Sequence, residues 1–447
     1  MHAVAKYLAG YAEPEIGLAK LIDRRYERAL VVPAFRERAT LVDGFVRAAE
    51  TSPGRTLAVV VVNAPADAAV SAHAENERLI ADLVARLERV DAVSRTPRAW
   101  LGAGHEGSLD VLVVDRASEG ARLPPKRGVG LARKIGADLA LALHVSGVVR
   151  SSWIFGSDAD ATLPDGHFDV SGIAGESDAA IVFPFWHEPG PDAAVTRATA
   201  IYELSIRYYA AGLAWARSPF AFHTLGSATA VSAPAYAMVR GYPRREAAED
   251  FYLLNKIAKV GPVVRSPGHA VRLESRASAR TPFGTGRGVM ETLSGGERDF
   301  YSPEVFSVLK ALLHGVEAFS ETGDIDAFYE KVGGLPPGPR AVVSSLLEKL
   351  GACSVLAAAS RELPARGAKR LRVHSWFDAF RTLKLVHALR DRCFPSMPWR
   401  GALAGAPFFG HALSEDDGEA VANARAHFDR TERELPRRTG PAAFGVY

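Results

Sequence analysis

The sequence predicts an α/β protein with a mostly parallel sheet flanked by helices, followed by a helical C-terminal region. Apolar runs such as residues 56–63 and 108–115 have the length of strands, and segments of helical periodicity separate them. Alternation of this kind indicates a doubly wound sheet. Beyond residue 295 the periodicity is helical, with Pro and Gly between the segments. We therefore expect an N-terminal helical segment at 1–27, a sheet domain at 28–294 and a helical region at 295–447.

Length and composition limit the class of protein. The chain has 447 residues, 48% of them hydrophobic, which is enough for one large core and a second unit. The net charge is only +3 and basic residues rarely cluster with aromatic ones, so a nucleic-acid partner is not expected. The two cysteines, Cys353 and Cys393, suggest no disulfide framework, which is typical of a reducing compartment. Residues 1–20 do not resemble a signal peptide, and apolar runs such as 57–62 are too short to span a bilayer. We expect a soluble, cytoplasmic protein.

The predicted elements alternate from the first strand onward. Pro33 interrupts a buried strand, and the next strand is nearly continuous valine, a composition typical of parallel strands covered on both faces. The predicted strands lie at 28–37, 56–63, 108–115, 152–157, 179–185, 225–231 and 262–265. The predicted helices lie at 40–50, 75–89, 129–143, 196–215 and 233–239, with another from 249. The C-terminal helices are predicted at 303–319, 324–332, 339–360 and 375–392.

Two aspartates follow the fourth of these strands, one residue apart. Strand side chains i and i+2 point to the same side, so Asp158 and Asp160 can reach one ligand from the carboxyl end of the strand. Ligands of open α/β sheets bind at that edge. Two carboxylates there suit a hard divalent cation, Mg²⁺ or Mn²⁺. The alternative is a strand-ending turn with two solvated acids.

Five segments, taken in order, resemble the motifs of family 2-like glycosyltransferases. The resemblance runs from about residue 28 to residue 288. It implies a GT-A fold, a nucleotide-diphosphate sugar as donor, Mn²⁺ or Mg²⁺ as metal, and transfer of a hexosyl unit to a hydroxyl acceptor. The segments are 31–37 (Val-Val-Pro-Ala-Phe-Arg-Glu), 130–136 (Gly-Leu-Ala-Arg-Lys-Ile-Gly), 157–160 (Ser-Asp-Ala-Asp), 241–243 (Gly-Tyr-Pro) and 249–250 (Glu-Asp).

The sequence departs from the family pattern at three points. The usual acidic end of the second strand reads Asn63 to Asp67, and Lys134 stands where the family has asparagine. The Gln-x-x-Arg-Trp motif of processive synthases is absent, which argues against a polymerising enzyme. The C-terminal helices lie outside the resemblance.

The resemblance implies a metal site and a donor site. The metal ligands would be Asp158, Asp160 and His269, although a lone histidine is otherwise a surface or packing residue. Asp158 would hold the ribose or share the ion. The donor-binding residues implied are Pro33, Ala34, Phe35, Glu37, Asn63, Asp67, Arg133, Lys134, Asp158 and Arg280.

A loop rich in glycine, serine and arginine follows the late strand. It carries Arg276, Arg280 and Arg287, and guanidinium groups match phosphate oxygens bidentately. Such a loop could close over a diphosphate and exclude water. An ordinary solvated loop would have the same composition.

Asp250 is the candidate general base, with Glu249 beside it. An inverting transfer needs a carboxylate that takes the proton of the acceptor hydroxyl. The pair also opens a predicted helix, where the helix dipole favours acids. Both interpretations can hold together, and Glu249 is expected to orient the site rather than to react.

Three other functions compete with glycosyl transfer. Asp158-x-Asp160-x-Thr162 fits the nucleophile motif of haloacid-dehalogenase-like phosphatases, but that motif normally closes the first strand of the sheet and here closes the fourth. Gly128-Val129-Gly130 is a weak dinucleotide fingerprint, because Arg133 takes the third glycine position. A non-catalytic nucleotide-sugar binding module would keep the same cleft.

An amphipathic helix is predicted in the C-terminal region. Trp376, Phe380, Leu383, Val386 and Leu389 recur at helical spacing, with basic residues between them. We expect this stripe to pack against the protein and to shape the acceptor side. A membrane-surface helix is the alternative.

Overall fold

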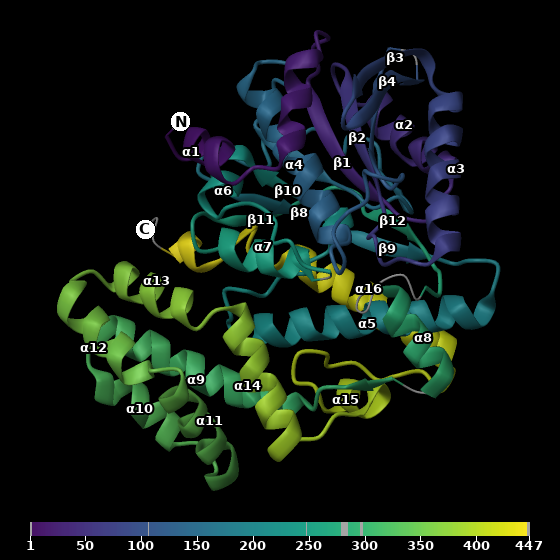
Figure 1. Cartoon of the computed structure of the whole chain (residues 1–447). Coiled ribbons are helices and arrows are strands. Elements are labelled where there is room, and N and C mark those ends of the chain that lie inside the picture. The colour runs from purple at the N-terminus through teal and green to yellow at the C-terminus, as the bar shows by residue number, and fades with distance from the viewer. Residues whose placement is uncertain (1, 106, 247, 279–284, 296–297, 445–447) are drawn as a thin grey trace. The chain divides into compact units, whose positions relative to one another are not determined.

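The structure, a computed structural model, describes residues 2–105, 107–246, 248–278, 285–295 and 298–444. It divides the chain into two compact units, which are described separately (Figure 1). The sheet unit comprises Met1–Pro191, Thr224–Val260 and Val264–Arg287, and the helical unit comprises Asp192–His223, Gly261–Val263 and Gly288–Tyr447. The last change of unit lies close to the predicted boundary, but the predicted helix at 196–215 belongs to the helical unit and not to the sheet domain.

Four parallel strands form the centre of the sheet unit. They lie in the order β6 (Trp153–Gly156), β1 (Arg28–Ala34), β2 (Thr56–Asn63) and β5 (Leu109–Arg116). Every residue of β1 and β2 is buried, as expected for apolar strands covered on both faces. Because these strands are parallel, their carboxyl ends meet at one edge of the sheet.

Antiparallel strands extend both sides of this centre, so the sheet is mixed and not mostly parallel as predicted. β4 (Arg98–His105) pairs with β5 and forms a hairpin with β3 (Glu88–Arg95). On the other side, β10 (Thr229–Ser232) pairs antiparallel with β6 and with β8 (Ala180–Val182), and β11 (Val263–Arg265) follows β8. The sequence does not predict the hairpin because β3 is exposed or half-exposed along its length and lacks an apolar alternation.

The chain reverses its direction across the sheet between β5 and β6. α2 (Asp43–Glu50) and α3 (Val70–Arg86) follow β1 and β2 as the chain steps towards β5, whereas α4 (Val129–Val145) carries it back to β6 on the far side of β1. This makes the edge between β1 and β6 a topological switch point, the place where open α/β sheets bind ligands.

A small second sheet lies next to that edge. β7 (Ala161–Thr162) pairs antiparallel with β12 (Val271–Glu274), and β12 pairs parallel with β9 (Phe185–Glu188). Leu273 lies opposite Ala161. The residues that follow β12 are therefore brought beside Asp160, which directly precedes β7.

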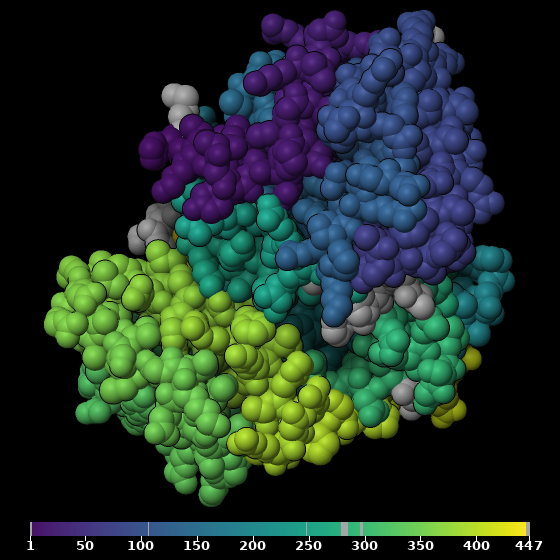
Figure 2. All heavy atoms as spheres, viewed as in Figure 1, coloured from purple at the N-terminus to yellow at the C-terminus, as the bar shows by residue number. Residues whose placement is uncertain are grey.

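The N-terminal residues, predicted as a helical segment, belong to the sheet unit. They form α1 (His2–Gly10) and a 3-10 helix (Pro14–Leu21), and in Figure 2 their purple atoms lie directly on other atoms of the same unit. A buried cluster holds them there. Asp138 of α4 accepts hydrogen bonds from the hydroxyls of Tyr7 (2.5 Å) and Tyr236 (2.7 Å) and from the ammonium of Lys134 (2.8 Å).

The helical unit is built from long helices around its own apolar core. Gly351, at φ +70°, interrupts the predicted helix at 339–360. The prediction of a single helix was wrong because apolar residues recur at helical spacing on both sides of this glycine. The helices of this unit are α5 (Ala193–Trp215), α9 (Pro303–Thr322), α10 (Ile325–Gly333), α11 (Pro337–Lys349), α12 (Ala352–Glu362), α13 (Arg366–Trp376), α14 (Ala379–Arg392), α15 (Trp399–Gly405) and α16 (Asp417–Glu434), and α8 (Thr285–Gly295) begins at the change of unit.

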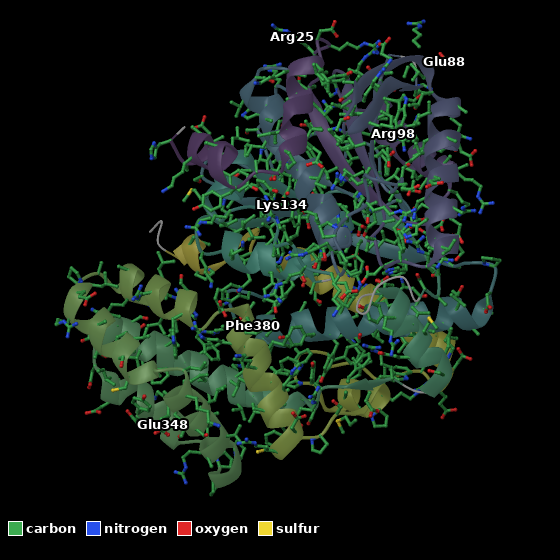
Figure 3. All side chains as sticks on the ribbon, in the orientation of Figure 1. Arg25, Glu88, Arg98, Lys134, Glu348 and Phe380 are labelled. Atoms are coloured by element: carbon green, nitrogen blue, oxygen red, sulfur yellow. The ribbon has the colours of Figure 1, made fainter. Side chains whose placement is uncertain are left out.

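The predicted helix at 375–392 is interrupted, because α13 ends at Trp376 and α14 begins at Ala379. Of the predicted stripe, Val386 and Leu389 are fully buried in the core of the helical unit, Leu383 is half-buried, and Phe380 lies near the start of α14 with 36% of its surface exposed (Figure 3). In the described residues no single helix has the length and apolarity to cross a membrane. Taken together, α11 and α12 have the length and composition of a membrane span, but the pair is bent by 67°.

His167 is an unsatisfied polar residue in the core of the sheet unit. Its ring lies 4.2 Å from that of Phe183 and 5.3 Å from that of Phe168, and neither ring nitrogen has a hydrogen-bond partner among the described residues. Burial lowers the pKa of His167 to about 3. The imidazole is therefore neutral in the folded protein and costs stability.

Replacing His167 with leucine is expected to stabilise the protein by about 1–3 kcal/mol, because two unpaired nitrogens leave the core. The difference in unfolding free energy between His167→Leu and wild type should increase by about 2 kcal/mol as the pH falls from 6.5 to 5. Over that range the unfolded wild-type chain takes up a proton on His167, whereas the folded protein does not. Urea unfolding of wild type, His167→Leu and His269→Leu at both pH values measures it. The exposed His269 serves as control, and a pH-independent gap for His167→Leu would contradict the linkage argument.

Candidate active site

Charged side chains from distant parts of the sequence gather at the switch point. β6 ends at Gly156, and the next amide, of Ser157, donates a hydrogen bond to the carbonyl of Val31 in β1 (3.0 Å). Asp158 and Asp160 follow directly. Glu37 lies three residues beyond the end of β1. The parallel ends of β6 and β1 thus bring all three carboxylates to one edge.

A buried arginine holds the first aspartate. Arg133 of α4 is 3% exposed, and its Nε donates to Oε1 of Glu249 at 2.8 Å. Its Nη2 pairs with Oδ1 of Asp158. Its Nη1 donates to the carbonyls of Gly226 (3.2 Å) and Ser157 (3.3 Å). The guanidinium is therefore fixed on every side, and a Cβ at position 226 would collide with it.

A second arginine holds the second aspartate. Arg276 donates from Nη1 and Nη2 to the two carboxylate oxygens of Glu37 at 2.9 and 3.0 Å. Its Nη2 also lies 2.8 Å from Oδ2 of Asp160. The small sheet produces this contact, because the amide of Glu274 at the end of β12 donates to the carbonyl of Asp160 (3.3 Å). Each aspartate of the motif therefore has its own arginine, and each arginine its own glutamate.

Asp250 lies at the start of α7 (Glu249–Ile257), beside the Arg133 group. Its Oδ2 accepts from the amide of Gly226 (3.0 Å) and its Oδ1 from the amide of Phe251 (2.7 Å). Burial and then the charge of Glu249 raise its pKa to about 7, against the pull of Arg133. A carboxyl poised near neutral pH is suited to proton transfer.

The site as a whole carries excess negative charge. Burial raises the pKa of Asp160 to about 7 and the charges of Asp158 and Glu37 contribute, although Arg276 opposes the shift. With every group ionised, the five carboxylates at positions 37, 158, 160, 249 and 250 outnumber the two guanidinium groups at 133 and 276 with which the described residues of the site are paired. An anionic ligand would need a further cation in order to bind here.

The predicted metal ligands are only partly assembled. In the described part of the chain, no group of three or more His, Cys, Asp or Glu side chains could hold a metal ion. His269 is exposed in the segment before β12. Asp158 and Asp160 fit a hard divalent cation through their oxygen donors and the surplus negative charge. One oxygen of each, however, is already bound by an arginine.

Some of the predicted donor-binding residues lie at the charged site or at the end of β1, and the others do not. Glu37, Arg133 and Asp158 lie in the charged site, and Pro33 and Ala34 form the end of β1 with Phe35 just beyond it. Asn63 is buried and donates to the carbonyl of Ala34 (3.1 Å), so it ties β2 to β1, while Asp67 is exposed and accepts from the amide of Lys126 (3.4 Å). Arg280 lies outside the described residues.

Lys134 belongs to a different place. Its ammonium is held by Asp138 and the hydroxyl of Tyr7 in the buried cluster that fixes the N-terminal segment (Figure 3). Neighbouring helix positions point in different directions, so Arg133 faces the site while Lys134 does not.

Sequence reasoning missed how the charges are paired. The carbonyl of Gly226 accepts a hydrogen bond from Arg133, and its amide donates one to Asp250. A single glycine in the sequence does not indicate either contact. Arg276 was expected to clamp phosphate and is found between two carboxylates. In comparisons with known proteins, no family model and no curated protein matches this chain.

Proposed function

We propose that the chain is a glycosyltransferase of the GT-A type, which moves a hexosyl unit from a nucleotide-diphosphate sugar to an acceptor hydroxyl. The observation that carries this proposal is the convergence of Glu37, Asp158, Asp160 and Asp250 at the switch-point edge, with Arg133 and Arg276 among them. Carboxylates for a cation, a guanidinium group that can turn to phosphate (Arg276) and a poised base are the parts that such a transfer needs.

Each group has a definite task in the proposed reaction. Asp158 and Asp160 would hold Mn²⁺ or Mg²⁺, which supplies charge stabilisation for the departing diphosphate. Arg133 keeps Asp158 oriented, because it is anchored by Glu249 and two carbonyls. Asp250 takes the proton of the acceptor hydroxyl, in a transfer that inverts the anomeric centre. Glu249 positions the site through Arg133.

The surroundings of Asp158 do not favour the phosphatase alternative. A phosphate group beside a nucleophilic carboxylate needs a cation to balance its charge. Lys134 of α4 is held by Asp138 in the buried cluster, and Arg133 already pairs with Asp158 and Glu249. A lysine to balance the phosphate at this edge is therefore not supplied by α4.

The proposal is tested by a thermal-shift panel of UDP-, GDP- and ADP-sugars with and without Mn²⁺. Ligands that bind the native state raise its melting temperature by mass action. We expect at least one donor to stabilise the protein, and no stabilisation by any of them would contradict the proposal.

Replacing Asp160 with alanine is expected to abolish the Mn²⁺-dependent part of that stabilisation. The variant loses one of the two carboxylates of the motif but no part of the buried Arg133 group, so the fold should be retained. Circular dichroism checks the fold, and Asp165→Ala, an exposed aspartate paired with Arg47, is the matched control. Unchanged Mn²⁺ dependence in Asp160→Ala would remove Asp160 from the site.

A further inference from the structure

The two arginines of the site differ in how firmly they are held. Arg133 is buried and fixed by two carboxylates and two backbone carbonyls. The side chain of Arg276 is 29% exposed, and among the described residues its hydrogen bonds and ion pairs go to Glu37 and Asp160 alone. Arg133 is thus part of the framework, whereas Arg276 can move without exposing a backbone group.

We propose that Arg276 competes with the divalent metal for Asp160. This inference rests on the proposed function. The surplus negative charge around Asp160 requires a positive group, and Arg276 now provides it at 2.8 Å. A divalent metal on the same carboxylate would repel the guanidinium, so metal binding weakens the Arg276–Asp160 pair and that pair weakens metal binding.

The released guanidinium stays at the site because Glu37 still holds it. The bidentate pair with Glu37 uses two N–H groups, and an arginine has five. The remaining donors then face the edge where the diphosphate of the donor would lie, and guanidinium groups bind phosphate oxygens well. Arg276 therefore opposes binding of the metal and supports binding of the nucleotide.

Opposite effects on two ligands follow from this exchange. Arg276→Gln removes the competitor, so Mn²⁺ alone should bind about tenfold more tightly than to wild type. The same variant lacks the phosphate contact, so at saturating Mn²⁺ the nucleoside diphosphate should bind about tenfold more weakly. A variant that was merely loosened would bind both ligands more weakly.

The experiment uses the full chain and two probes. Free Mn²⁺ is measured by electron paramagnetic resonance during titration with MnCl₂, and UDP, GDP and ADP are then titrated calorimetrically at saturating Mn²⁺. Arg38→Gln is the matched control, because Arg38 is an exposed arginine of the same edge that pairs with Glu274 and not with Asp160. It should leave both affinities unchanged, and Arg276→Lys should give intermediate values.

The outcomes separate this inference from the proposed function. Equal or weaker Mn²⁺ binding by Arg276→Gln, or Mn²⁺ binding by neither protein, overturns the role of Arg276. Weaker binding of both probes also overturns it, because that result is a structural effect. If none of the three nucleotides binds wild type, the proposed function fails, while the Mn²⁺ comparison still decides whether Arg276 competes for Asp160.

Discussion

Asp250→Asn is expected to lower turnover by about 10²- to 10⁴-fold, roughly 3–5 kcal/mol of barrier, while donor affinity holds. The amide keeps the shape of the side chain and one oxygen that can accept from the amide of Gly226 or Phe251. It has no basic oxygen to take the proton of the acceptor. The measurement is nucleoside diphosphate release with a donor found by thermal shift and a panel of hydroxyl-bearing acceptors.

The pH dependence gives this prediction a second readout. Because the pKa of Asp250 is about 7, wild-type kcat/KM should fall by about tenfold per pH unit below pH 7, as the base becomes protonated. Asp160 has a pKa of about 7 as well, so the profile reports the pair.

Stability should move in the opposite direction to activity. A carboxyl whose pKa is raised by folding stabilises the protein below about pH 4, and that contribution is lost as pH rises through about 7. Asp250→Asn never ionises, so it should be more stable than wild type at pH 8 and no more stable at pH 4. Near-normal turnover with weakened donor binding would assign Asp250 to binding, and retained anomeric configuration would exclude the inverting mechanism.

The central strands could be read from the sequence because their signal is local. β1, β2, β5 and β6 are continuous apolar runs, and the structure has each within a few residues of its predicted bounds. The hairpin of β3 and β4 carries no such signal, since its outer strand is exposed. The assignment of α5 to the helical unit also depends on tertiary contacts, because its own periodicity says only that it is a helix.

The candidate site shows the same division. The apolar run that ends just before Asp158 was enough to predict that Asp158 and Asp160 lie at the carboxyl edge, although both lie in the turn after β6 and not on the strand. Their partners were not predictable, because Arg133 meets Glu249 across 116 positions and Arg276 meets Glu37 across 239. The contact of Arg276 with Glu37 depends on the register of β7 against β12. The contact of Arg133 with Glu249 depends on the close approach of α4 to the residues before α7, where a Cβ at Gly130 would collide with backbone.

Arg133→Met is expected to destabilise the sheet unit by about 3–5 kcal/mol, the usual loss when one partner of a buried ion pair is removed. Methionine fills much of the same volume, so the loss is not a cavity effect. The substitution leaves the carboxylate of Glu249 buried without its guanidinium partner, and the carbonyls of Ser157 and Gly226 each lose a hydrogen-bond donor. Native-state hydrogen exchange of the β1, β2 and β5 peptides measures the loss within the sheet unit.

Two further variants decide whether charge is the cause of that loss. Arg47→Met breaks an exposed pair with Asp165, in which both side chains are more than half exposed, and it should cost less than about 1 kcal/mol. Arg133→Met combined with Glu249→Leu removes both buried charges, so it should recover part of the stability that the single variant loses. If the double variant is as unstable as the sum of the two single variants, Arg133 stabilises the unit through packing and not through its pair with Glu249.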